Sequence, residues 1–266
     1  MSVYFELSGI KLPAYGTMAF LGLLVSVAIA FYYARLYSIH MIDVVNCICY
    51  GGLGLITGAK LFYALPFLPE IYEMIKSDGI SDFISYLPQI LPELFAGYVF
   101  YGGFIGIVAG IAFYTHFRRL PFWNFMNVLA IITPLFHGFG RIGCFFAGCC
   151  YGREYHGLFA VTFPQNSYNP ELALTERFPV QLMESVCCFI LFAILAFYGR
   201  KPRESGKLMG IYLIAYPVIR FITELFRGDD IRGMIDFGYF QISTSQIISL
   251  LLFPFGILLY YRTKNK

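Results

Sequence analysis

Hydrophobic residues run through this chain in seven long stretches, and the short segments between them carry most of the charge. A helix needs about 20 apolar residues to cross a bilayer, and each stretch is close to that length. The pattern predicts seven membrane-spanning helices at roughly 15–36, 43–66, 94–117, 122–146, 179–199, 207–226 and 240–262. The first stretch is not expected to be a cleaved signal, because it lacks a basic start and continues into Arg35.

Composition supports this all-α, multi-pass membrane class. Of the 266 residues 58% are hydrophobic and only 13% are charged, with a mean hydropathy of +0.67. Soluble domains carry about 25% charged residues, so a water-soluble protein is excluded. The net charge of +3 is too small to indicate a nucleic-acid partner. We expect one transmembrane domain over residues 1–266.

Basic residues concentrate in alternate connections between the predicted spans, at Arg35, Arg118, Arg119, Arg200, Lys201, Arg203, Lys207, Arg262, Lys264 and Lys266. The positive-inside rule then predicts an outside N-terminus and a cytoplasmic C-terminus. The two longest segments between spans, about 67–93 and 147–178, are expected on the outer face.

Five charged residues fall inside predicted spans, namely Lys60, Arg141, Arg220, Glu184 and Glu224. A charge at membrane depth costs roughly 2.5–3.5 kcal/mol on insertion scales, so such groups pair or line a site. One interpretation is two structural ion pairs, Arg141–Glu184 and Arg220–Glu224, the second with i,i+4 spacing. The other is an anionic lipid headgroup, because cations exceed anions here and guanidinium groups bind phosphate well.

The segment HGFGRIGCFFAGCCYGREY, residues 137–155, combines an arginine, three cysteines and several glycines. Cys144, Cys149 and Cys150 with His137 or His156 could supply zinc ligands, but C-x4-C-C lacks the C-x2-C spacing of structural zinc motifs, and we expect no metal. A disulfide among these cysteines and a glycine packing seam are alternatives. Glycine-rich backbone beside Arg141 also suits an anion, and only this interpretation explains the arginine.

The same segment resembles the signature of the prolipoprotein diacylglyceryl transferase family, Gly-Arg-x-Gly-Asn-Phe-x-Asn-x-Glu-x-x-Gly. Further family motifs are matched in order along the chain: AYGTM with Tyr15, GAKLFY with Lys60, FYGGFIG with Tyr101, Gly102 and Gly103, FPVQLMES with Gln181 and Glu184, RFITELFRGDD with Arg220, Glu224, Arg227 and Asp230, and STSQIISL with Ser245. The resemblance covers nearly the whole chain, and the family's seven spans and outside N-terminus agree with the topology derived above.

The resemblance implies transfer of a diacylglyceryl group from phosphatidylglycerol to the lipobox cysteine of a prolipoprotein, with release of glycerol phosphate, in a bacterial cytoplasmic membrane and without a cofactor. By motif position, Arg141 and Arg220 would hold the phosphate, with Lys60 as a third cation. Glu184 and Glu224 would orient the arginines. The remaining candidates for substrate binding are Tyr15, Gly102, Gly103, Cys144, Gly152, Gln181 and Arg227.

This sequence departs from the family pattern at four positions. The family histidine is Tyr101, the two signature asparagines are Cys144 and Ala147, and the glutamate is Cys149. Tyrosine, with a pKa of about 10, is a poor base, so His137 is a candidate for a relocated base. The departures leave open a paralogue that uses the same lipid with another acceptor. A lipid transporter is a further alternative, since YGGLGLITG and YGGFIGIVAG are similar internal segments.

Overall fold

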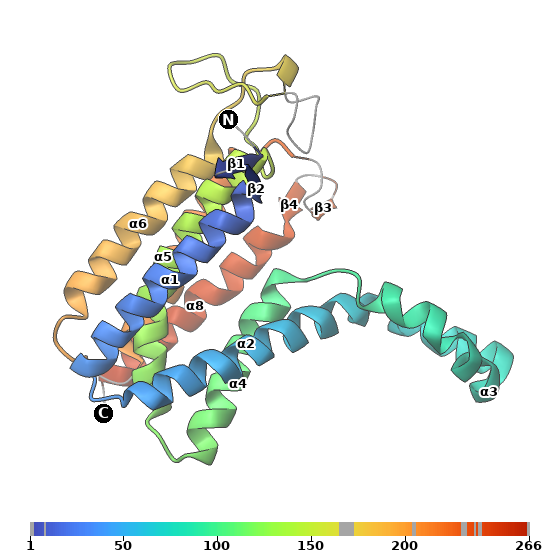
Figure 1. The fold of residues 1–266 in the computed structure, drawn as a ribbon, viewed down its shortest axis with the longest axis horizontal. Helices are drawn as coiled ribbons and strands as arrows, with labels where there is room; N and C mark the ends of the chain where they lie inside the picture. Colours follow the sequence, from blue (N-terminus) through green and yellow to red (C-terminus); the bar gives the residue numbers. More distant parts are fainter. Residues whose placement is uncertain are drawn as a thin grey trace. The chain divides into compact units, whose positions relative to one another are not determined.

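The computed structural model describes residues 3–7, 9–164, 173–203, 206–229, 233–236, 238 and 241–264. These residues form eight α-helices, a short 3₁₀ helix and two small β-hairpins (Figure 1). The chain divides into two compact units, one of residues 1–38 and 126–266 and one of residues 39–125.

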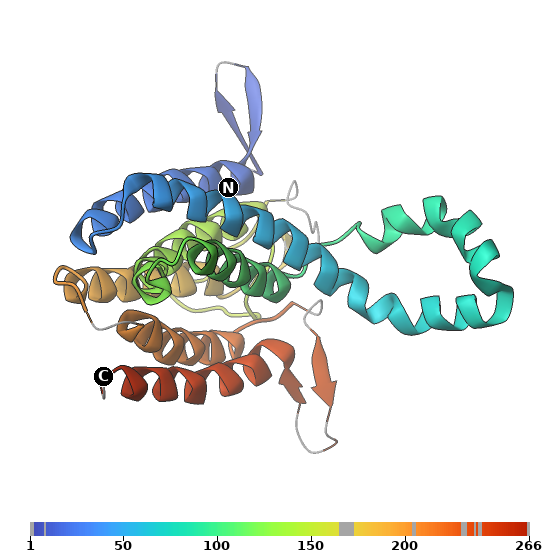
Figure 2. The ribbon, with the colours of Figure 1, turned by 90° about the horizontal axis from the view of Figure 1, so that it is seen from below.

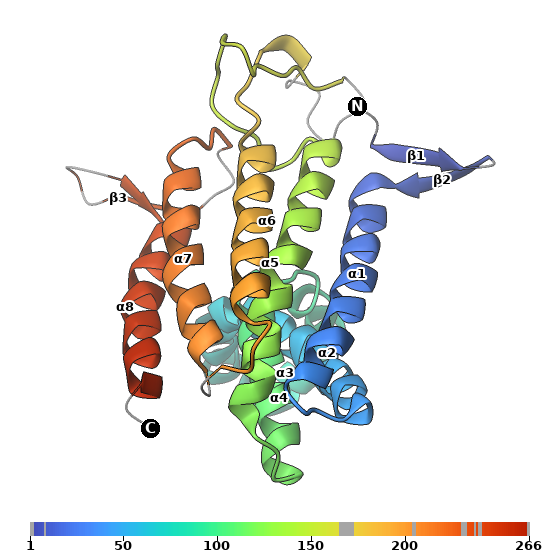
Figure 3. The same ribbon diagram turned by 90° about the vertical axis from the view of Figure 1, so that its left-hand side faces the viewer.

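The first unit begins with a hairpin of β1 (Tyr4–Leu7) and β2 (Ile10–Pro13), which leads directly into α1 (Ala14–Leu36) (Figure 2). It continues with α5 (Phe122–Ala147), α6 (Val180–Tyr198) and α7 (Lys207–Glu224). A second hairpin of β3 (Met234–Asp236) and β4 (Gln241–Ser243) precedes α8 (Thr244–Lys264). These helices stand side by side in Figure 3.

Glycines set the spacing of the helices in this unit. A Cβ at Gly22 of α1 would lie 2.6 Å from the Cβ of Phe139 on α5, and one at Gly138 would lie 2.7 Å from the ring of Phe189 on α6. A Cβ at Gly210 of α7 would lie 3.0 Å from the backbone of Tyr260 on α8. Small residues are the usual means by which membrane helices approach closely. The helix-seam interpretation of the quoted segment therefore holds at Gly138 but not at Gly140, where a Cβ would meet nothing within 4 Å.

The second unit contains α2 (Met41–Ala64), a 3₁₀ turn (Leu65–Phe67), α3 (Leu68–Leu94) and α4 (Phe100–Phe117). Helices α2 and α4 are antiparallel and in backbone contact: a Cβ at Gly54 would lie 2.0 Å from the carbonyl oxygen of Gly106, and one at Gly58 would lie 2.3 Å from that of Gly102. The similar glycine spacing of the two segments therefore serves close packing of this pair.

The multi-pass class is confirmed, whereas the count of spans differs in the described residues. Five helical segments are long and apolar enough to cross a membrane: Ala14–Leu36, Met41–Ser77, Phe122–Ala147, Val180–Tyr198 and Thr244–Arg262. The apolar part of α4 is short (Tyr101–Phe117), and α7 carries Lys207, Arg220 and Glu224 within 18 residues. The segment near 67–93, expected between spans, is helical and kinked at Gly79, whose φ is 85°.

Candidate functional site

Charged side chains from three helices form a row of alternating sign in the first unit. The Nε of Arg141 on α5 lies 3.0 Å from Oε2 of Glu184 on α6, and Nη1 of Arg220 on α7 lies 3.3 Å from the same oxygen. The Nη2 of Arg220 lies 2.6 Å from Glu224, and Nη1 of Arg227 lies 3.7 Å from Glu224. We call these five residues the charge ladder. Both ion pairs considered from the sequence are present in it.

The two ends of the ladder differ. At one end, Arg227 makes an ion pair and hydrogen bonds with Asp229. Burial alone would lower the pKa of Arg227, but the hydrogen bond and the charge of Asp229 outweigh it and raise the pKa above its usual value. The other end is Arg141, whose side chain is 12% exposed. Within the part of the chain that the structure describes, Glu184 is its one ion-pair partner. The Arg141 end of the ladder is therefore cationic.

Glu184 is the central acid of the ladder, and its side chain is only 2% exposed. Besides the two guanidinium groups, its Oε1 lies 3.7 Å from Nε2 of His137 and accepts a hydrogen bond of 3.5 Å from the Tyr216 hydroxyl. The Tyr216 hydroxyl also lies 3.4 Å from His137 Nε2. The candidate base is thus held against the ladder. The sequence reasoning missed Tyr216, although it stands four residues before Arg220 and therefore on the same helix face.

Arg220 is also fixed from α8, because its Nη2 donates a hydrogen bond of 3.3 Å to the hydroxyl of Ser245. Ser245 in turn lies 2.9 Å from the hydroxyl of Ser243. Buried polar groups held by several partners are rigid. Arg220 therefore has more partners than Arg141. Asp230, part of the quoted motif, lies outside the described residues, and Asp229 is the acid that pairs with Arg227.

The segment that follows α5 is tied to both α6 and α7. The amide of Arg153 donates to the carbonyl of Phe226 (2.9 Å), and the amide of Phe178 donates to the carbonyl of Arg153 (3.0 Å). A Cβ at Gly152 would lie 2.2 Å from the carbonyl oxygen of Phe178, so this position needs glycine because two chain segments meet there. Gln181 at the start of α6 is 1% exposed and donates a 2.8 Å hydrogen bond to the carbonyl of Cys149.

Tyr15 lies in the first turn of α1, against α5. A Cβ at Gly143 would lie 3.2 Å from the Cα and from the ring of Tyr15. The side chain of Tyr15 remains 49% exposed, so its ring reaches the surface beside the end of α5.

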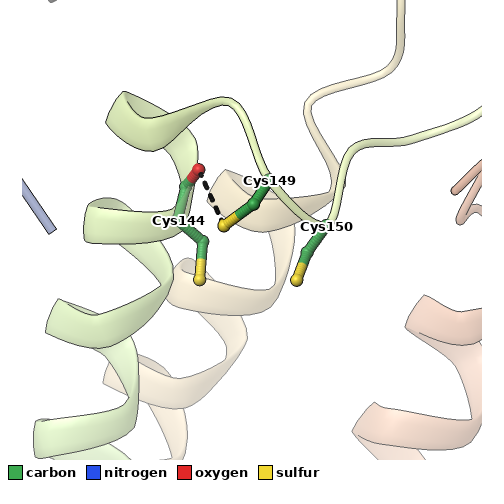
Figure 4. Close-up of side chains that lie close together, drawn as sticks. All are labelled: Cys144, Cys149 and Cys150. Carbon is green, nitrogen blue, oxygen red and sulfur yellow. Dashed lines mark hydrogen bonds between the residues drawn. The ribbon is translucent and has the colours of Figure 1, made fainter. Parts of the chain in front are cut away.

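Three thiols converge where α5 ends. The sulfur atoms of Cys144, Cys149 and Cys150 all lie within 4.8 Å of one another, and each residue is half-buried (Figure 4). The thiol of Cys149 turns back toward the helix and donates to the carbonyl of Cys144 at 3.7 Å. All seven cysteines are free, so the disulfide considered from the sequence is absent from the structure. A hydrogen bond from the Cys144 thiol, with the charges of Arg141 and Arg227, lowers the pKa of Cys150.

The other four predicted site residues belong to the second unit. The ammonium of Lys60 on α2 donates to the carbonyl of Phe95 and lies 3.8 Å from the centre of the Tyr98 ring. Gly102 is a packing position, since a Cβ there would lie 2.5 Å from the carbonyl oxygen of Gly58. Tyr101 and Gly103 lie beside it in the first turns of α4.

Two apolar hollows lie where α6 ends and α7 begins. Ile190, Ile194, Phe197, Tyr198 and Ile211 line the larger one, and Tyr260 of α8 joins the second. No residue of the charge ladder lines either hollow.

Comparison with known proteins gives consistent matches over the whole chain. Residues 2–262 match the family model described as prolipoprotein diacylglyceryl transferase. The chain is 33% identical to the phosphatidylglycerol–prolipoprotein diacylglyceryl transferase of Clostridium tetani, over 97% of this chain and 96% of the relative. It is 32% identical to the second such protein of Clostridium perfringens (98% and 94% covered) and 31% identical to that of Mannheimia succiniciproducens (99% and 94% covered).

Proposed function

Because this chain belongs to the prolipoprotein diacylglyceryl transferase family, we propose that it moves the diacylglyceryl group of phosphatidylglycerol onto a cysteine thiol of a prolipoprotein and releases glycerol phosphate. In this reaction the acceptor sulfur forms a bond to the glyceryl carbon. The bond between that carbon and the phosphate oxygen breaks, and its electron pair stays on the phosphate. The protein must therefore stabilise negative charge on the leaving phosphate and accept the thiol proton.

The observation that carries the proposal is the cationic end of the charge ladder. The Arg141 guanidinium is nearly buried and has a single acid partner in the described residues, and that acid is shared with Arg220. A phosphodiester beside Arg141 would supply the acceptor oxygens that a shared carboxylate does not. Arg141 is thus the proposed phosphate-binding cation. Arg220, Glu184 and Glu224 act on it as positioning residues, because their partners are one another.

His137 is the proposed acceptor of the thiol proton. Its Nε2 faces Glu184 and Tyr216, one turn of α5 before Arg141. A neutral imidazole has a ring nitrogen that can accept a proton, so His137 is the better candidate than the Tyr101 hydroxyl. By the family motifs alone, Tyr101 is proposed as a catalytic hydrogen-bond donor, and Lys60 and Gly103 are proposed as lipid contacts.

We further propose that the two units act as one transferase domain, because the family match runs through both, from residue 2 to residue 262. We also propose a bacterial cytoplasmic membrane, seven spans, an outside N-terminus and a cytoplasmic C-terminus. The bacterial relatives and the distribution of basic residues support this arrangement.

The test incubates the purified protein with phosphatidylglycerol and a peptide that contains a lipobox cysteine. We expect a thioether adduct and equimolar glycerol phosphate, both detected by mass spectrometry. Arg141→Ala is expected to lower the rate by about 10²–10³-fold, as for other groups that stabilise developing charge. Arg200→Ala is the matched control, since Arg200 is exposed at the far end of α6. Lipid cleavage without the adduct would refute the acceptor, and transfer by Arg141→Ala at the control rate would refute the site.

A further inference from the structure

The spacing of Cys144, Cys149 and Cys150 along the chain does not match a zinc motif. The fold nevertheless brings the three thiols together as a set of metal ligands. Their sulfur atoms lie within 4.8 Å of one another. In a tetrahedral zinc site with Zn–S bonds of about 2.3 Å, the sulfur atoms stand about 3.8 Å apart. The sulfur atoms are therefore at most about 1 Å farther apart than in such a site.

The backbone around these thiols is built to bring them together. Helix α5 ends at Ala147, and Gly148 then adopts a φ of 71° that reverses the chain. Cys149 donates its amide to the carbonyl of Cys144 (3.1 Å), which closes the turn. Cys150 itself has a φ of 54°, a conformation that costs a residue with a side chain about 1–2 kcal/mol. The buried Gln181 amide holds this turn from α6 through the carbonyl of Cys149.

The electrostatic surroundings also suit a bound thiolate group. Arg141, the cationic end of the charge ladder, precedes Cys144 by three residues on α5, which is close to one helical turn. Three thiolates and one Zn²⁺ carry a net charge of −1, and the Arg141 guanidinium has the sign that offsets it. Cysteines that serve only as apolar packing are normally fully buried, whereas these three are half-buried and face one another.

We propose that Cys144, Cys149 and Cys150 bind a thiophilic divalent cation of the zinc type and leave its fourth position open. Three protein ligands with an open position are typical of catalytic zinc, and closed four-ligand sets are typical of structural zinc. The C-x2-C spacing that the sequence lacks belongs to the structural kind. One of the three ligands, Cys144, lies about one turn of α5 after Arg141, the cationic end of the charge ladder.

The ligand that we assign to the open fourth position is the acceptor cysteine, and this step rests on the proposed function. A metal-bound thiol is deprotonated, so an acceptor cysteine entering the fourth position loses its proton, for which His137 is available. The acceptor sulfur would form its bond to the glyceryl carbon while the carbon–oxygen bond breaks toward the phosphate at Arg141, and the metal held by the three cysteines would supply only the lowered pKa of the acceptor thiol.

The metal site is tested first without lipid or peptide. Purified full-length protein, reduced and stripped with a chelator, is titrated with Zn²⁺ and with Co²⁺. We expect one equivalent of metal, thiolate-to-cobalt charge-transfer absorption and, by X-ray absorption, three sulfur neighbours at about 2.3 Å from zinc. Zinc should also protect Cys144, Cys149 and Cys150 from alkylation while the exposed Cys49 reacts equally with and without it. This last measurement needs no variant and is independent of folding defects.

Variants then locate the site. Replacement of any one of the three cysteines by serine should weaken metal binding by more than about 100-fold, the upper range for loss of an outer-shell partner. Cys49→Ser is the control and should bind as the unmodified protein does. Equal binding by all four variants, or no binding after reduction, overturns the site.

The role of the metal is tested by transfer itself. We expect a fourth sulfur neighbour when the lipobox peptide is added, and transfer that falls on chelation and returns with Zn²⁺. Full transfer by the metal-free protein overturns the metal role and leaves the proposed function standing. Metal binding with no transfer from phosphatidylglycerol under any condition overturns the proposed function and leaves the metal site standing.

Discussion

Glu184→Gln is the substitution whose effect can be worked out most fully from the structure. Glutamine keeps the volume and one acceptor oxygen but removes the charge that Arg141, Arg220 and His137 share at 3.0, 3.3 and 3.7 Å. Arg220 keeps Glu224 at 2.6 Å. The loss therefore falls mainly on Arg141, whose one ion-pair partner in the described residues is this acid.

Loss of one partner of a buried ion pair costs about 3–5 kcal/mol. Because the amide still accepts a hydrogen bond, we expect the lower end, about 3 kcal/mol, for the free energy of unfolding. For a chain of this size, each kcal/mol shifts the unfolding midpoint by about 2–4 °C. The expected fall is therefore about 6–12 °C, measured by thermal unfolding of the purified protein in uncharged detergent.

The matched control is Glu176→Gln. Glu176 lies 3.2 Å from the Nδ1 of His156, but the two side chains are 51% and 77% exposed. Exposed pairs contribute at most about 1 kcal/mol, so its midpoint should fall by no more than about 4 °C. A shift in Glu184→Gln no larger than that of the control would refute the central role assigned to Glu184.

Thermal unfolding of the same variant in two lipids tests whether Arg141 binds the phosphate of the lipid. An unbalanced Arg141 should bind a phosphate more strongly, so mixed micelles with phosphatidylglycerol should restore more of the lost midpoint than micelles with a zwitterionic phospholipid. Equal recovery in both lipids would contradict a phosphate site at Arg141.

Three further substitutions test the site and the helix that carries it, all by thermal unfolding. Gly152→Ala should cost about 1–3 kcal/mol, because its Cβ would lie 2.2 Å from the carbonyl oxygen of Phe178. Gly140→Ala, where a Cβ meets nothing within 4 Å, should instead stabilise α5 by about 0.5–1 kcal/mol; a loss there equal to that at Gly152 would contradict the packing argument. Asp229→Asn should cost about 1.5–3 kcal/mol through the weakened bond to Arg227, and an unchanged midpoint would show that this end of the ladder is not held by the pair.

Periodicity and composition were sufficient for the class of protein and for most of its helices. The length of each apolar stretch predicts a helix whatever its neighbours are, because backbone groups in a bilayer must be satisfied within the segment. Each of the seven predicted stretches contains a helix, but the apolar part of α4 is short and α7 carries three charged residues, so neither is among the five segments long and apolar enough to cross a membrane by themselves. The i,i+4 spacing of Arg220 and Glu224 likewise predicted their ion pair, because both residues lie on one face of the same helix.

Contacts between elements required the tertiary structure. Glu184 makes ion pairs with both Arg141 and Arg220 because α5, α6 and α7 pack together. The spacing of these residues along the chain does not predict that arrangement. The cluster of three thiols also depends on the tertiary structure. Cys144 lies in the last turn of α5, and only the turn at Gly148, anchored by Gln181 from α6, brings Cys149 and Cys150 back to it. Sequence spacing measures distance along the chain, whereas a site is made by side chains that the fold brings together.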